Sequence, residues 1–188
     1  MKRSLFLKIG LSIPFLTTLT TKLRAGTARE PKGFKVDAGK DRYNKILAPF
    51  DGDKFFCKLS TADTDGDNYV FESTREKEGG PILHVHYDQD EWWYILEGEF
   101  LVKIGDQTYN AKPGDFVFGP RKVPHTFAKV GSGLGRLIIG FQPAGKMEAY
   151  FKKINDGVAA NMSEAERDQM RKDHGFEKVG PPLTYLKQ

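Results

Sequence analysis

The stretch that decides the fold joins two histidines to a run of aromatic residues: His84-Val85-His86-Tyr87-Asp88-Gln89-Asp90-Glu91-Trp92-Trp93-Tyr94-Ile95-Leu96-Glu97-Gly98. The chain has four histidines in 188 residues, and two of them stand here. Side chains two positions apart in a β-strand point to the same face. A strand through this stretch therefore aims His84 and His86 at one point, and Glu91 follows after a short turn.

A second segment supplies the third histidine of a candidate metal site. It contains Pro113-Gly114-Asp115 and, after a turn, Pro124-His125-Thr126-Phe127. A lone histidine on a strand is usually a core or surface residue, but three of four at matching spacing favour a metal site. Three imidazoles and a carboxylate suit Fe, Mn, Ni, Co, Cu or Zn and do not suit Ca or Mg. The sequence therefore predicts one divalent transition metal held by His84, His86, Glu91 and His125.

The spacing of these residues resembles the two motifs of the cupin superfamily. The pattern His-x-His-x4-Glu-x6-Gly is met by His84, His86, Glu91 and Gly98, and a later Pro-His-x-Phe is met around His125. The stretch resembles small bacterial cupins that are grouped with quercetin 2,3-dioxygenase. The family's glycine six residues before the first histidine is Glu78 here, and its asparagine after the last histidine is Lys129.

The resemblance implies a fold and a reaction. The expected fold is all-β, a double-stranded β-helix or jelly-roll barrel with short C-terminal helices. The expected activity is that of an oxidoreductase, a dioxygenase that inserts O2 across an enol of a small aromatic substrate. In that scheme Glu91 is both a metal ligand and the catalytic acceptor of a substrate proton. Two alternatives remain open, a non-catalytic exported cupin that binds a small molecule or metal, and a sugar isomerase or epimerase.

The period of the hydrophobic residues supports a barrel without reference to the family. Between residues 54 and 143, short alternating runs are separated by Gly, Pro and Asp, which is typical of an all-β barrel or sandwich. Beyond Gly145 the spacing becomes helical, and Ser163 with Glu166 forms a capping box for a helix that ends near His174. The predicted strands are 54–60, 68–74, 82–87, 92–97, 99–104, 107–111, 115–119, 125–130 and 136–142.

Four aromatic residues are predicted to form the substrate pocket. Strand alternation turns Trp93, Phe100 and Phe127 toward the barrel interior, and we place Phe118 with them. Such a pocket suits a small-molecule substrate that is aromatic or carries an enol. A sugar phosphate would need inward-facing basic residues, and the motif strands contain few.

The strand after Glu91 is apolar on both faces. Trp92, Tyr94 and Leu96 alternate with the inward residues, so the outer face of this strand must also be covered. Either the C-terminal helices or a second subunit could cover it, and we favour a homodimer.

Charge and composition bound the class of protein. The chain is 39% hydrophobic and 29% charged, as expected for one globular domain, with a net charge of +4. Residues 1–28 contain five basic residues and no acidic one, so the rest of the chain has a net charge of −1. The basic excess therefore belongs to the N-terminal segment and gives no case for a nucleic-acid partner.

The N-terminal segment has the features of an export signal. A basic start precedes an uncharged run of 13 residues, Ile9 to Thr21, and Gly26 and Ala28 are small residues before a possible cleavage point. The start is similar to a twin-arginine signal that lacks its second arginine. We expect an exported, periplasmic or extracellular protein; an uncleaved anchor or a disordered extension is the alternative. The expected organisation is a signal peptide at 1–28, an arm at 29–45, a barrel at 46–145 and a C-terminal extension at 146–188.

Overall fold

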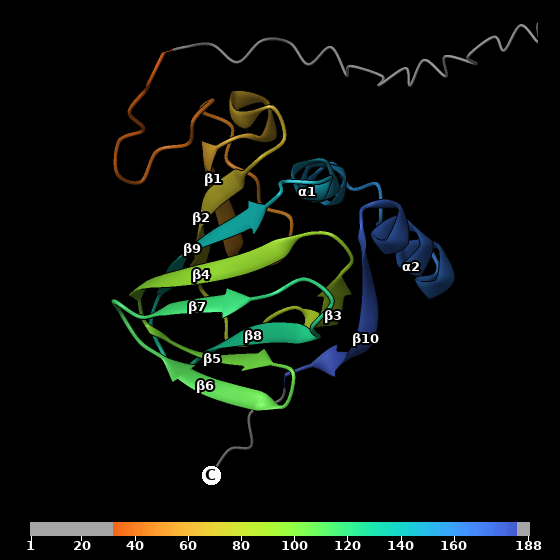
Figure 1. The fold of residues 1–188 in the computed structure, drawn as a ribbon. Coiled ribbons are helices and arrows are strands. Elements are labelled where there is room, and N and C mark those ends of the chain that lie inside the picture. The colour runs from red at the N-terminus through yellow and green to blue at the C-terminus, as the bar shows by residue number, and fades with distance from the viewer. Residues whose placement is uncertain (1–31, 184–188) are drawn as a thin grey trace, which may run out of the picture.

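Two five-stranded antiparallel sheets face each other and enclose the core of the protein (Figure 1). The computed structural model describes residues 32–183. The predicted export signal lies outside these residues and stays a prediction. The first sheet has the order β1-β2-β9-β4-β7, with β1 Asp53–Leu59, β2 Tyr69–Arg75, β9 Gly135–Gln142, β4 Asp90–Glu97 and β7 Phe116–Gly119. The second has the order β10-β3-β8-β5-β6, with β10 Phe176–Pro182, β3 Ile82–His86, β8 His125–Val130, β5 Glu99–Ile104 and β6 Gln107–Ala111.

The predicted mostly-β architecture is confirmed, and each of the nine predicted strands agrees with an observed one within two residues. The tenth strand, β10, was not predicted. It pairs antiparallel with β3, so that Phe176 lies opposite His86 and Lys178 lies opposite His84. β10 is an edge strand with β3 on one side only. Proline is tolerated there because an N–H on the open side of an edge strand has no strand to bond to, so its loss costs no ladder hydrogen bond.

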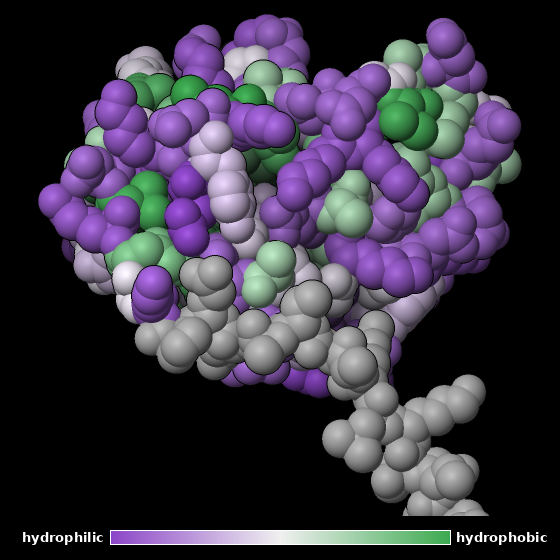
Figure 2. Space-filling model, turned by 90° about the horizontal axis from the view of Figure 1, so that it is seen from above, coloured by the Kyte–Doolittle hydropathy of each residue, from purple (hydrophilic) through white to green (hydrophobic). Residues whose placement is uncertain are grey.

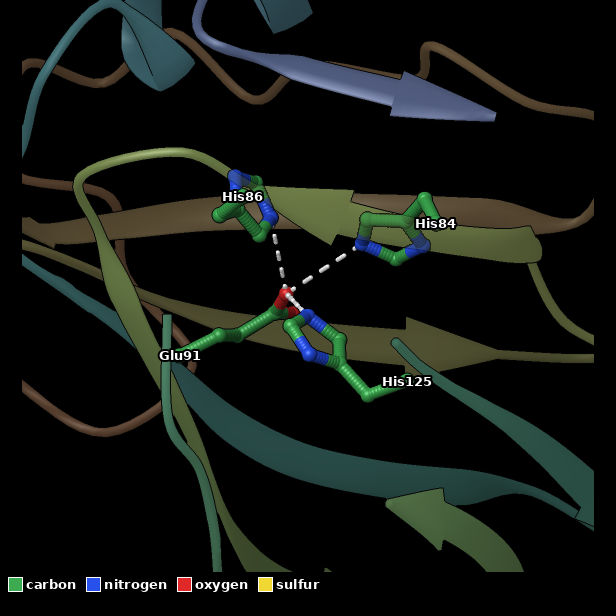
Figure 3. Close-up of side chains that lie close together, drawn as sticks. All are labelled: His84, His86, Glu91 and His125. Atoms are coloured by element: carbon green, nitrogen blue, oxygen red, sulfur yellow. Dashed lines mark hydrogen bonds and ion pairs between the residues drawn. The ribbon is translucent and has the colours of Figure 1, made fainter. Parts of the chain in front are cut away.

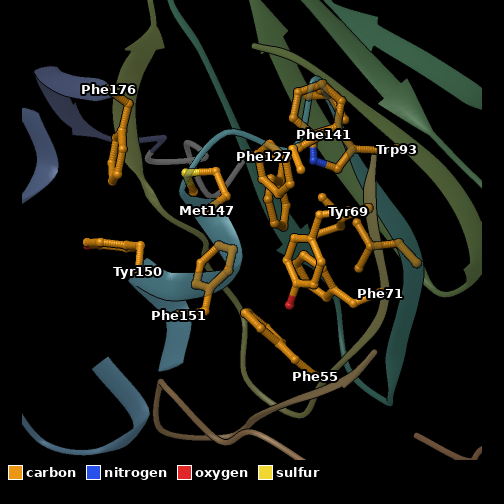
Figure 4. Packing of buried hydrophobic residues seen from close by; sticks show 14 of the residues in the cluster. Phe55, Tyr69, Phe71, Trp93, Phe127, Phe141, Met147, Tyr150, Phe151 and Phe176 are labelled. Atoms are coloured by element: carbon orange, nitrogen blue, oxygen red, sulfur yellow. The ribbon is translucent and has the colours of Figure 1, made fainter. Parts of the chain in front are cut away.

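The core between the sheets follows from strand alternation. Trp93, whose inward face was predicted, is fully buried on β4, and so are Ile95 on β4 and Val102 on β5. The aromatic residues pack with offset or edge contacts, and Phe55 stacks on Phe71 with ring centroids 4.5 Å apart (Figure 4). Burial of this apolar surface supplies the main driving force for the fold.

Two helices and a short turn complete the chain. Helix α1, Met147–Asn155, packs Phe151 against Phe55 and Phe71 with ring centroids 5.1 and 5.5 Å apart, so it covers one end of the space between the sheets (Figure 4). Helix α2, Glu164–Asp173, begins at the predicted Ser163–Glu166 capping box and contacts β10. A 3-10 helix, Thr61–Thr64, links β1 to β2. No helix within residues 32–183 is long and apolar enough to cross a membrane.

The fourth histidine, His174, caps the C-terminus of α2. It is buried, and its ring donates from Nδ1 to the carbonyl of Met170 at 2.6 Å, as befits a structural residue. In the end-on view of Figure 2, hydrophilic residues dominate the surface and hydrophobic ones form small separate groups.

Candidate metal centre

Both sheets contribute residues to one buried cluster. His84 and His86 project from β3, and His125 lies on β8 directly opposite His84. Glu91 reaches the same point from β4 in the facing sheet. One side-chain nitrogen or oxygen from each of the four residues lies within 4.8 Å of all the others, and all four residues are buried. The structure thus brings together the four residues predicted as metal ligands.

One carboxylate oxygen stands at the centre of the cluster (Figure 3). Glu91 Oε2 lies 3.2 Å from Nε2 of His86, 3.2 Å from Nε2 of His125 and 3.5 Å from Nε2 of His84. The three imidazoles therefore present the same ring nitrogen to the same place. Such convergence is what a site for a single ion requires.

The opposite ring nitrogens determine which tautomer each histidine adopts. Nδ1 of His84 lies 2.8 Å from the carbonyl oxygen of Ile82, and Nδ1 of His125 lies 2.9 Å from that of Val123. A carbonyl oxygen only accepts hydrogen bonds, so Nδ1 carries the proton in both rings. Nε2 is then left with its lone pair directed toward Glu91.

Gln89 accepts a hydrogen bond from the third ring, that of His86. The role of Gln89 was not predicted from the sequence. Its side-chain Oε1 lies 3.2 Å from Nδ1 of His86, and its Nε2 donates to the carbonyl of Ala144 at 2.9 Å. The second contact fixes which end of the amide faces His86. The position of Gln89 between His86 and Glu91 was the one signal available in the sequence.

The charges of the cluster suit a cation. Burial lowers the pKa of His86, which keeps its imidazole neutral. Burial alone would raise the pKa of Glu91, and only imidazole hydrogen bonds donated from Nε2 of His125, His84 and His86 would bring it well below its usual range. With the protons on Nδ1, those bonds are not available, and a cation between the four side chains would take their place in keeping Glu91 ionised. Three lone pairs and an ionised carboxylate facing one another are unfavourable without a positive charge between them. The donor set therefore fits a divalent transition metal.

A cavity of about 420 Å³ adjoins the cluster, and Glu91 and His84 form part of its wall. The rest of the wall is mainly apolar and comes from both sheets, from the loop between β2 and β3, and from α1 and α2. Sequence reasoning missed two buried charged residues of this wall, Asp53 on β1 and Arg75 on β2, because neither lies near the motifs. The buried apolar residues of the wall are Phe55, Phe71, Phe127, Ile139, Phe141, Met147, Tyr150, Phe151 and Phe176.

The four predicted pocket residues lie in different places relative to the cavity. Phe127 lines the cavity, whereas Trp93 and Phe100 are buried behind it, with ring centroids 6.0 and 6.3 Å from that of Phe127. The prediction for Phe118 is wrong, because its side chain lies on the outer surface with 51% exposure. The register explains the error: Phe118 pairs with Trp92, and both therefore share the face opposite to Glu91 and Trp93.

Comparison with known proteins places this arrangement in a family. Residues 65–140, which include all four clustered residues, match the family model described as the cupin domain. The chain contains a cupin domain. An RmlC-like cupin from Shewanella frigidimarina has the same fold, with a TM-score of 0.50 and 20% identity over 64% of this chain and 98% of that one.

Two curated proteins share sequence with the cupin domain. Quercetin 2,3-dioxygenase of Bacillus subtilis is 25% identical over 116 residues, which are 62% of this chain and 34% of that protein. An uncharacterised protein of Methanocaldococcus jannaschii is 37% identical over 51 residues, 27% of this chain and 41% of that protein. The matches span less than half of each relative. They show that the cupin domain of this chain resembles the quercetin 2,3-dioxygenase group.

Proposed function

We propose that the protein is a metal-dependent dioxygenase that acts on a small aromatic or enol-bearing substrate. The observation that carries this proposal is the cluster of three Nε2 lone pairs around one ionised carboxylate, placed at the wall of an apolar cavity. A closed structural metal site would need no such cavity. The similarity to quercetin 2,3-dioxygenase supports this choice of reaction.

The residues of the chain have distinct tasks in this proposal. His84, His86, Glu91 and His125 would hold the metal, which when bound supplies Lewis acidity and redox chemistry. Glu91, which is ionised and lines the cavity, would also accept the proton of a substrate hydroxyl. The apolar wall orients an aromatic ring and keeps water away from it. Both atoms of O2 enter the product, so the reaction needs no separate reductant.

Oxygen consumption tests the proposal directly. The purified protein is loaded separately with Fe, Mn, Co, Ni, Cu or Zn and screened with flavonols and catechols in an oxygen electrode. We expect substrate-dependent oxygen uptake with at least one metal. Tight binding of a metal without oxygen uptake from any substrate would contradict the proposal and favour a non-catalytic binding protein.

Two variants separate metal binding from proton transfer. His86→Ala should lose most of its bound metal and its activity while the barrel stays folded, because apolar strands supply the core. Glu91→Gln should keep part of its metal but lose turnover by roughly 100-fold or more, since an amide cannot act as the base. Metal content by mass spectrometry and circular dichroism accompany each assay. Full activity of Glu91→Gln would exclude its role as the base.

A further inference from the structure

One buried arginine faces a cavity that is otherwise mainly apolar. Arg75 ends β2, is only 7% exposed and lines the same cavity as His84 and Glu91. Arginine is almost never buried without partners, because removing its charge from water is costly. The contacts of its guanidinium therefore indicate what the cavity is built to receive.

The guanidinium has more donors than the protein uses. Its Nη2 donates to Asp53 Oδ2 at 2.5 Å, and its Cζ lies 4.8 Å from the centre of the Phe127 ring. Its Nε is buried and has no acceptor among the described residues. A guanidinium offers five N–H donors, and a single carboxylate contact leaves most of them for another acceptor.

The other cations at the cavity are already paired or exposed. Lys77 is an exposed residue that pairs with Asp51 at the rim. Arg171 on α2 pairs with Glu164 and Asp168, at 3.1 and 2.5 Å. Of the arginines and lysines that line the cavity in the described part of the chain, Arg75 alone is buried.

Arg75 lies along the same wall as the candidate metal centre. Phe127, which the guanidinium covers, is two residues after His125 on β8, about 7 Å along the strand. Both side chains point into the space between the sheets. A molecule with an aromatic ring could therefore extend from the guanidinium toward the cluster.

The local charge favours a monoanion. A bound divalent ion and Arg75, set against the carboxylates of Asp53 and Glu91, would leave one net positive charge in the cavity. The other charged residues of the wall cancel one another: Lys77 and Arg171 against Asp51 and Glu78. A phosphate dianion would exceed this charge and meet the carboxylate of Asp53, whereas a carboxylate carries one charge and matches the planar guanidinium.

We propose that the cavity binds an aromatic acid, with its carboxylate held by Arg75 and its ring directed toward the four-residue cluster. This inference rests on the proposed function for the reaction at the other end of the ligand. It names a substrate class, aryl carboxylates, and a specificity-determining residue that lies outside the cupin motifs.

A matched pair of ligands tests the anchor. Calorimetric titration of the protein loaded with Zn, which has no redox chemistry, compares 3,4-dihydroxybenzoate with 3,4-dihydroxybenzamide, which differ in charge but hardly in shape. We expect the acid to bind wild type at least about tenfold more tightly, as for a hydrogen bond to a charged group. The double variant Arg75→Met/Asp53→Asn, which leaves no unpaired buried charge, should lower this ratio to about one. Equal affinities in wild type would overturn the inference, and that comparison depends on no variant.

Lys77→Met is the control for a general charge effect, because it removes one positive charge at the rim of the same cavity. It should retain the preference for the acid. A preference that survives in the double variant, or that disappears equally in Lys77→Met, would overturn the assignment to Arg75. Oxygen uptake with neutral catechols and no acid preference would leave the proposed function intact and remove the anchor. A preference for the acid in a protein that binds no metal would support Arg75 as the anchor and contradict the proposed function.

Discussion

Proton positions on three imidazoles determine what the cluster can bind. The carbonyls of Ile82 and Val123 and the amide of Gln89 each take a hydrogen bond from an Nδ1 atom. These partners hold the rings in place and leave Nε2 free to donate its lone pair, as is usual for histidines that bind metals. The affinity of the site should therefore depend on residues that are not ligands.

Gln89→Leu should weaken metal binding without abolishing it. Loss of the acceptor for Nδ1 of His86 releases the ring and its tautomer, and changes of this kind typically cost about 10- to 100-fold in metal affinity. Competition with a chelator of known affinity measures the change. Gln107→Leu, at an exposed position on β6, is the control. Wild-type affinity in Gln89→Leu would show that the amide does not orient His86.

Asp53 should make stability depend on pH. Burial raises its pKa from 3.8 to about 6, although Arg75 acts in the opposite direction. Because the folded state holds this proton more tightly than the unfolded state, the stabilisation is complete below pH 3.8 and is lost as pH rises through about 6. An asparagine side chain does not titrate, so Asp53→Asn does not lose stability in this pH range. The free energy of unfolding of Asp53→Asn minus that of wild type should therefore increase by up to about 3 kcal/mol between pH 4 and pH 7. Urea denaturation at several pH values checks this, and parallel profiles would contradict it.

At the scale of elements, a loop between β2 and β3 helps to form the cavity wall. Gly79 exchanges two backbone hydrogen bonds with Lys129 on β8, at 3.0 and 2.9 Å. Gly80 then lies so close to β8 that a Cβ atom would stand 1.7 Å from the carbonyl oxygen of Phe127. Glycine is required here by the approach of two backbones, since no side-chain movement can make room.

Gly80→Ala should destabilise the protein by about 1–3 kcal/mol, because either the loop or β8 must move. The same movement should shift Phe127 and weaken ligand binding in the cavity. Urea denaturation followed by circular dichroism gives the stability. Gly33→Ala is the matched control, since nothing lies within 4 Å of its added carbon. Equal stability of the two variants would refute the close packing of this loop.

At the scale of the whole molecule, an aromatic surface remains uncovered on the outside of the first sheet. Tyr94, Phe116 and Phe118 are each at least 40% exposed, and Trp92 packs against Phe116 with ring centroids 5.8 Å apart. Within the described chain, α1 and α2 lie elsewhere and leave these residues open (Figure 1). An exposed apolar group of this kind is typical of a protein interface.

We therefore propose that this surface joins two copies of the chain. Light scattering coupled to size-exclusion chromatography should give the mass of a dimer. Phe118→Glu should shift the mass to that of a monomer, because it would bury a charge in an apolar interface. Tyr109→Glu, at an exposed position on the neighbouring strand β6 of the other sheet, tests how far the interface extends. A wild-type protein that is monomeric at high concentration would contradict the proposal.

Most of the fold could be predicted because each predicted strand carries its own signal. Alternation in Glu99–Ile104 and the turns on either side were enough to place β5 and its buried face. β10 has no such signal in its Gly-Pro-Pro segment and exists because β3 offers it an edge. The error at Phe118 has the same origin, since its face depends on the register with β4 rather than on its own neighbours.

By itself, the sequence determined the strands and the N-terminal cap of α2 through local spacing, and the four residues of the cluster through the two motifs that contain them. Only the tertiary structure decided that Gln89 orients His86, that Arg75 and Asp53 enter the cavity and that Phe118 leaves it. The physical reason is that such contacts arise between segments distant in sequence, where strand register and loop approach set the geometry. A periodic pattern describes which face a residue takes within its own strand, but not what stands opposite to it.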